Sequence, residues 1–154
     1  MIGGERALTV GEIALVRSVF GRAIDPAPVR IKRRRFFPLQ PRDTLMTPMG
    51  HIHLHPRSPH YLADYSLADP ALQGLFIHEM THVWQAQQRG RWYLLAMRHP
   101  FCRYDYSLRP GWKLERYGLE QQAEIVRHAF LLRMGRRVRG VGDKAAYDLL
   151  VDFA

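Results

Sequence analysis

The chain has 154 residues, of which 47% are hydrophobic and 11% aromatic, and this composition predicts one globular domain over residues 1–154. Lysine and arginine exceed the acidic residues by nine, so the surface favours anionic partners. The single cysteine, Cys102, excludes an internal disulfide and a cysteine-rich zinc finger, and no apolar run predicts a membrane span. Glu5 and Glu12 interrupt the N-terminal apolar region, which argues against a signal peptide and predicts a protein that is cytoplasmic as synthesised.

The N-terminal third is predicted to form one helix and two strands. Thr9-Val10-Gly11-Glu12 fits a capping box, and apolar residues follow at helical spacing until Gly21. Val29 to Phe37 and His51 to His55 have the composition of strands in a small sheet. Strict alternation in the second strand places its three histidines on one face and its apolar residues on the other. We interpret it as a half-buried strand that borders a cleft, with His53 as a candidate cleft residue, and not as a second metal site.

The first predicted strand contains the basic cluster Lys32-Arg33-Arg34-Arg35, which supplies much of the net charge. Such a cluster can bind nucleic acid or anionic lipid, but no RNA-recognition signature or helix-turn-helix accompanies it. We favour a solvated edge strand whose charges discourage edge-to-edge association, and we do not expect nucleic acid as a partner.

The chemistry of the sequence centres on His78-Glu79-Met80-Thr81-His82, which has the pattern H-E-x-x-H. On a helix, His78 and His82 lie one turn apart on the same side, so both imidazoles can bind one metal ion. Zinc suits imidazole ligands, and a catalytic zinc needs a third protein ligand and an open position for water. Glu79 would take the proton from that water as it attacks a carbonyl. The alternative is a pair of half-buried histidines bonded to backbone carbonyls.

The local sequence predicts a helix around this motif. Asp69 is a suitable N-cap, Pro70 fits the first helical position, and Gly90 is a natural stop. An apolar stripe at helical spacing passes beside the motif and consists of Leu72, Phe76, Met80 and Val83. We therefore expect the two histidines to lie near the core and not in open solvent.

A second helix, from Tyr117 to near Gly135, offers the third ligand. Glu120 and Glu124 are one turn apart on the flank of its apolar face. If this helix packs beside the first one, one glutamate can complete the zinc site and the other can hydrogen-bond a ligand histidine. The alternative is that both are surface glutamates, with Glu124 paired to Arg127 or His128 at helical spacing.

Three tyrosines are further candidates because a phenol can stabilise an oxyanion or line a cleft. They are Tyr104, Tyr106 and Tyr117, and for the first two we consider core or rim packing the simpler expectation. Short helical patterns also cover Trp92 to Arg98 and Lys144 to Phe153.

Two segments together, Phe76 to Gln85 and Tyr117 to Val126, resemble a bacterial family. They are similar to the small Vgr-related proteins and to the zinc-metallopeptidase domain at the C-terminal end of some VgrG spike proteins of type VI secretion systems. The motifs cover a small part of the chain, although the layout from the N-terminal helix through the two strands is similar over most of it. The resemblance implies a compact α+β fold of the zincin type, specifically a Glu-zincin.

The resemblance also implies roles for individual residues. Zinc would be bound by His78, His82 and a glutamate, with Glu79 as general base. In many Glu-zincins the ligand glutamate is followed four residues later by an acidic supporting residue, and Glu120 and Glu124 match that arrangement. Glu120 is therefore assigned as the ligand and Glu124 as the supporting residue, or as the alternative ligand.

These features predict a zinc-dependent hydrolase that acts on amide bonds of a peptide, a protein or a cell-wall peptide. One alternative is a non-catalytic, zinc-stabilised accessory or binding module of a secretion system. Another is a basic protein that binds nucleic acid or an anionic surface. Because the sequence contains no spike module, we expect it either to act in its own cell or to be exported as a cargo of a dedicated secretion system.

Overall fold

The computed structural model describes residues 4–97 and 102–153. The strands are β1 (Glu5–Ala7), β2 (Arg30–Lys32) and β3 (Ile52–His53). The α-helices are α1 (Val10–Phe20), α2 (Pro70–Arg89), α3 (Tyr93–Met97), α4 (Leu119–Arg133) and α5 (Lys144–Leu150), and two 3₁₀ helices are η1 (Tyr65–Leu67) and η2 (Leu114–Arg116). In its described part the chain is thus α+β, as the sequence predicted, and it has one three-stranded sheet and five α-helices.

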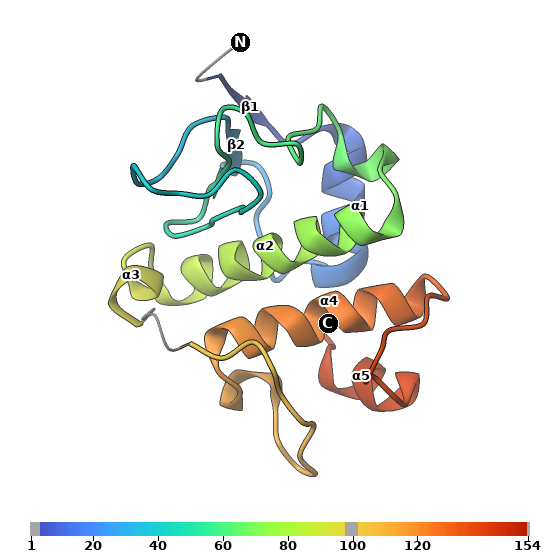
Figure 1. Cartoon of the computed structure of the whole chain (residues 1–154). Coiled ribbons are helices and arrows are strands. Elements are labelled where there is room, and N and C mark those ends of the chain that lie inside the picture. The colour runs from blue at the N-terminus through green and yellow to red at the C-terminus, as the bar shows by residue number, and fades with distance from the viewer. Residues whose placement is uncertain (1–3, 98–101, 154) are drawn as a thin grey trace.

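Helix α2 runs through the middle of the molecule. The sheet and α1 lie on one side of it, and α4 and α5 lie on the other (Figure 1). Helices α2 and α4 pack antiparallel, because Gly74 near the start of α2 lies against Leu131 near the end of α4, while Gln85 donates to the carbonyl of Leu119 at the opposite ends. A Cβ atom at position 74 would lie 3.3 Å from Leu131 Cδ2, so glycine allows the close approach.

The ends of the main helices follow from local chemistry. Asp69 accepts from the backbone N–H of Leu72, Pro70 occupies the first turn, and α2 stops before Gly90, all as predicted. Helix α5 is capped by Asp143 and is shorter at its C-terminal end than the predicted pattern. Arg98, the predicted end of the short helix α3, lies outside the described residues. None of the described helices combines the length and the apolar character needed to cross a membrane.

The sheet has the order β1-β2-β3, and its two predicted strands are shorter than expected. Strand β1 pairs antiparallel with β2, and β2 pairs parallel with β3, so that Ile31 lies opposite Ile52. The prediction of a basic edge strand was therefore wrong, because β2 is the central strand and the unpredicted β1 covers its outer side. Pairing ends at Lys32, which leaves Arg34 and Arg35 in an exposed loop.

The second predicted strand also differs from the expectation. Its three histidines do not share one solvent-exposed face, since His53 is buried together with Ile52 and Leu54. The physical reason is that the connection between β2 and β3 folds back. Met46 forms a β-bridge with His53, and the side-chain amide of Gln40 donates to the His53 carbonyl, so this connection covers the strand.

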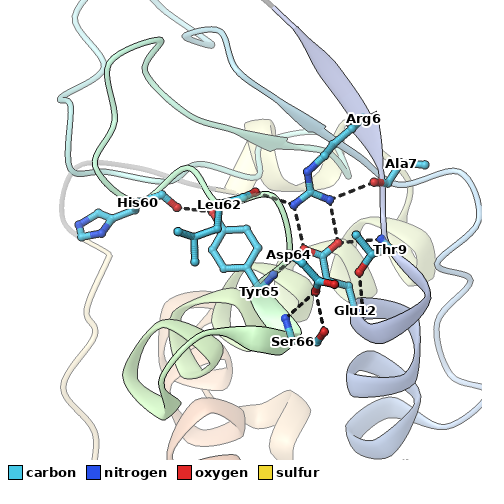
Figure 2. A network of polar contacts seen from close by, with 9 residues as sticks. All are labelled: Arg6, Ala7, Thr9, Glu12, His60, Leu62, Asp64, Tyr65 and Ser66. Carbon is cyan, nitrogen blue, oxygen red and sulfur yellow. Dashed lines mark hydrogen bonds and ion pairs between the residues drawn. The ribbon is translucent and has the colours of Figure 1, made fainter. Parts of the chain in front are cut away.

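A buried polar network joins β1, α1 and η1 (Figure 2). The predicted capping box is present, with Thr9 and Glu12 bonded to each other's backbone N–H groups. Glu12 is fully buried and forms two hydrogen bonds of 2.8 Å with the Arg6 guanidinium, and it also accepts from the backbone N–H of Tyr65 at 2.8 Å. Arg6 in turn donates to the carbonyl of Leu62. The network fixes the N-terminal strand and helix against the segment that leads into α2.

Candidate metal centre

Three buried side chains converge where α2 packs on α4. His78 and His82 come from α2, and Glu120 comes from the first turn of α4, where the helix dipole favours a carboxylate. His78 Nε2 lies 3.2 Å from Glu120 Oε2, and His82 Nε2 lies 3.1 Å from Glu120 Oε1. The ligand atoms of the three residues lie within 4.8 Å of one another. The cluster could therefore hold a metal ion.

The hydrogen bonds of His82 indicate which charge the cluster needs. Gln85 donates through Nε2 to the carbonyl of Leu119, which can only accept, so its Oε1 faces His82. That oxygen accepts at 2.8 Å from His82 Nδ1, so Nδ1 carries a proton, and a neutral imidazole then presents the lone pair of Nε2. Nε2 faces the Glu120 carboxylate at 3.1 Å, and two acceptors in contact repel each other unless a proton or a metal ion lies between them. A cation between them removes the repulsion, so the donor set fits a metal ion.

The surroundings of His78 favour a positive charge as well. Burial alone would lower the pKa of His78, but the carboxylates of Glu120 and Glu124 outweigh burial and raise this pKa to about 9. An imidazole with such neighbours holds a proton when no metal is present. Metal and proton therefore compete for the same nitrogen.

Glu124 lies behind His78 and outside the three-residue cluster. Its Oε1 is 3.9 Å from His78 Nδ1, and its carboxylate is 3.6 Å from both Arg127 and His128. Burial raises the pKa of Glu124, but the positive charges of His78, Arg127 and His128 outweigh it and lower the pKa. The pairs with Arg127 and His128 were expected for a surface glutamate, but Glu124 also lies within ion-pair distance of His78. Glu120, at 1% exposure, is not a surface residue at all.

Glu79 is buried one residue along α2 from His78 and is not a member of the cluster. The hydroxyl of Thr47 donates to Glu79 Oε2 at 2.5 Å, which fixes the carboxylate. Thr47 is fully buried in the connection between β2 and β3. The contact joins residues 32 positions apart, so no local pattern in the sequence could have indicated it. The role of Glu79 as general base stays a prediction.

The candidate tyrosines occupy different positions. The ring of Tyr104 stacks on His78 with 6.2 Å between ring centroids, and half of the residue is exposed. Tyr106 is bonded through its hydroxyl to His128 Nδ1 at 2.6 Å and to the Tyr147 hydroxyl at 2.7 Å, so it extends the Glu124 network away from the cluster. Burial raises the pKa of Tyr106. The Tyr117 hydroxyl accepts from a backbone N–H in the loop before η2.

His53, the candidate cleft residue, is not in the cluster. Its ring packs edge-on against Phe36 at 5.3 Å between centroids. Burial and the positive charge of Lys32 lower the pKa of His53 to about 4, so it is a neutral group at neutral pH.

Two hollows flank the centre. One of about 650 Å³ is bordered by Tyr104, Tyr106, Glu124 and His128, among others. The other, of about 370 Å³, is bordered by Glu120 and by residues of the η2–α4 region. Glu124 and Glu120 therefore each face a space that can admit solvent or a small molecule.

The fold and the site together define a small α+β domain with a candidate His-His-Glu metal centre between two antiparallel helices. No known family model matches the chain. It is 43% identical over 137 residues to the type VI secretion system spike protein VgrG2b of Pseudomonas aeruginosa. The matched region covers 82% of this chain but only 13% of the spike protein.

A solved structure extends this likeness to the fold. The effector domain of Pseudomonas aeruginosa VgrG2b superposes with a TM-score of 0.72 at 38% sequence identity, over 95% of this chain and 83% of that domain. The chain belongs to the family of the VgrG2b effector domain. The resemblance to the VgrG spike proteins is thereby confirmed at the level of the family.

Proposed function

We propose that the chain is a zinc-dependent hydrolase of amide bonds, most simply peptide bonds, with a zincin-like fold of the Glu-zincin type. The observation that carries the proposal is the buried convergence of His78, His82 and Glu120. Two imidazoles and one carboxylate form the ligand set of a catalytic zinc site, which keeps a further position open. Nε2 of His82 faces Glu120, and Gln85 occupies Nδ1, so Nε2 is the ring nitrogen free to bind zinc.

The neighbouring side chains suit amide hydrolysis. A bound zinc ion would polarise the amide carbonyl and make a water molecule more acidic. Glu79 takes the proton of the attacking water and passes it to the leaving amine. Thr47 holds one oxygen of Glu79, so the carboxylate keeps its orientation while it gains and loses the proton. Tyr104, half exposed against His78, is placed to donate a hydrogen bond to the developing oxyanion.

The supporting residues orient the ligands. Gln85 fixes the tautomer of His82, and Glu124 lies behind Nδ1 of His78. Outer hydrogen bonds of this kind keep imidazole ligands in position and increase their basicity. This arrangement favours Glu120 as the ligand and Glu124 as its supporting residue.

The family supplies a biological context for the proposal. VgrG2b is a type VI secretion system spike protein, and the part of it that has been solved is its effector domain. We propose that this chain likewise acts after delivery by a type VI secretion system. Its substrate would be a peptide or protein of the recipient, including cell-wall peptides.

The test is the substitution Glu79→Gln, with the exposed Glu5→Gln as control. Zinc content is measured on the purified proteins, and hydrolysis is followed by mass spectrometry of cleaved peptides in a proteome-derived mixture. We expect Glu79→Gln to retain zinc and lose at least a hundredfold in turnover, while Glu5→Gln behaves as wild type. Unchanged hydrolysis in Glu79→Gln rules out the mechanism, and a zinc-loaded wild-type protein that cleaves nothing indicates a non-catalytic module.

A further inference from the structure

Basic and apolar side chains are displayed together on the loop that follows β2. All six residues of the segment Arg34-Arg35-Phe36-Phe37-Pro38-Leu39 are exposed. Leu39 is 83% exposed, and Phe37 and Phe36 are 39% and 37% exposed. Adjacent exposed apolar side chains on a monomer mark an interaction site more often than scattered ones do. Nothing in the candidate metal centre requires them.

The loop has a defined shape, because Gln40 fastens it from inside. Gln40 is 2% exposed and accepts at 2.8 Å from the backbone N–H of Phe36. Its Nε2 donates at 2.9 Å to the carbonyls of Thr44 and His53, so both ends of the loop are tied to β3. Arg35 also donates to the carbonyl of Pro38. The apolar tips are therefore held outward, and little conformational entropy is lost when they bind a partner.

Between Asp25 and Asp43 the charges of the chain are all positive. Residues 26–42 contain six lysines and arginines and no acidic residue. Within the described part of the chain, no carboxylate lies within ion-pair distance of Arg34, Arg35 or Arg42. Slight desolvation and the positive charges of Arg35, Arg42 and Arg57 lower the pKa of His55, so these guanidinium groups share one region of the surface.

We propose that this loop is a docking surface for an anionic phospholipid bilayer. The guanidinium groups bind lipid phosphates, and Phe37 and Leu39 enter the boundary between headgroups and acyl chains. A bilayer accounts for both features at once, since an anionic surface attracts the arginines and a hydrocarbon layer accepts the apolar tips.

Other anionic partners account for only part of the surface. Nucleic acid would bind the arginines and could stack bases on Phe36 and Phe37. It offers no apolar layer for Leu39, which is more exposed than either phenylalanine. The same connection continues to Thr47, which contacts Glu79 beside the candidate centre. The proposal does not depend on the hydrolase activity.

The test is sedimentation of the full chain with vesicles of phosphatidylglycerol and phosphatidylcholine, and with vesicles of phosphatidylcholine alone. One variant replaces three arginines of the loop, Arg34→Gln/Arg35→Gln/Arg42→Gln. The matched control removes the same charge from an exposed basic loop after α4, Arg136→Gln/Arg137→Gln/Arg139→Gln. Circular dichroism and urea unfolding establish that both variants are folded.

We expect wild-type binding to the anionic vesicles only, with a partition coefficient that falls about fivefold for each loop arginine, or about a hundredfold in the triple variant. The matched control should fall less than fivefold. Leu39→Ser should also reduce binding severalfold, whereas Leu149→Ser, at an equally exposed position, should not.

Three outcomes would overturn the proposal. Wild-type protein that does not bind the anionic vesicles, or that binds the neutral ones equally, excludes this surface as a lipid site. Equal losses in the two triple variants show that net charge alone drives binding. Loop-dependent binding to duplex DNA without vesicle binding assigns the surface to nucleic acid.

Discussion

Gln85 provides the sharpest test of the candidate metal centre, because it touches no proposed ligand atom and still determines what His82 can do. It is 3% exposed, and its Oε1 accepts from His82 Nδ1 at 2.8 Å. In Gln85→Leu the imidazole loses this acceptor and can turn or change tautomer. Loss of such a partner lowers metal affinity by about 10- to 100-fold, which is about 1.4 to 2.8 kcal/mol. Competition with a chromophoric zinc chelator measures it.

The same substitution also affects stability, and a second variant separates the two effects. Gln85→Leu removes one donor from the carbonyl of Leu119 and leaves the side-chain oxygen of Gln122 without its donor, and an unsatisfied buried acceptor costs about 1 to 3 kcal/mol. Gln85→Glu removes the same donors but keeps an acceptor for His82. We therefore expect both variants to unfold at lower urea concentration and only Gln85→Leu to lose zinc affinity. Gln88 is exposed and lies three residues further along α2, so Gln88→Leu should change neither the unfolding midpoint nor the zinc affinity.

Equal losses of zinc affinity in Gln85→Leu and Gln85→Glu would refute the reasoning. In that case the disturbed packing of α2 on α4, and not the orientation of His82, would control the centre. Unchanged affinity in both variants would refute it as well, because His82 would then not be a ligand whose tautomer matters.

Three further predictions follow from buried polar contacts. Thr47→Val removes a donor to the Glu79 carboxylate and should lower kcat about 10- to 100-fold at unchanged zinc content. Thr47→Ser should retain activity, and equal kcat values in the wild type and both variants would contradict a role of Thr47 in orienting Glu79. Glu12→Gln leaves the Arg6 guanidinium without its carboxylate and should lower the free energy of unfolding in urea by about 3 to 5 kcal/mol, and a loss below about 1 kcal/mol would count against the network. The pKa of His53 is about 4, below its ordinary 6.5, so the unfolded chain binds the proton first. Stability present above pH 6.5 should therefore fall by about 3 kcal/mol as the pH drops to 4, and His53→Gln should flatten this dependence in urea titrations.

The helices were predictable because their signals are local. Thr9, Asp69 and Asp143 cap the helices that follow them through contacts within three residues, and these contacts are visible in the sequence. The spacing of His78 and His82 likewise fixes their common side of α2. Prediction succeeded where all the residues that determine a feature lie within one turn of the same helix.

The strands and the supporting residues have causes elsewhere in the chain. Residues 33–37 have strand-like composition, but among residues 4–97 and 102–153 no partner strand continues beside them, so the described pairing stops at Lys32. His53 alternates as a half-exposed residue would, but Met46 and Gln40 return to cover it. Thr47 finds Glu79 across 32 residues of sequence. None of these contacts leaves a periodic pattern.

The centre itself combines both kinds of cause. Helical spacing puts His78, His82 and Gln85 along one side of α2 and sets Glu120 and Glu124 one turn apart on α4, but spacing cannot decide which glutamate meets the histidines. A slide of α4 by one turn would exchange their roles. Gly74 against Leu131 at one end and Gln85 on Leu119 at the other fix the register, with Glu120 between the two imidazoles. Which glutamate meets the two histidines is therefore a property of helix packing, and it depends on residues outside the cluster.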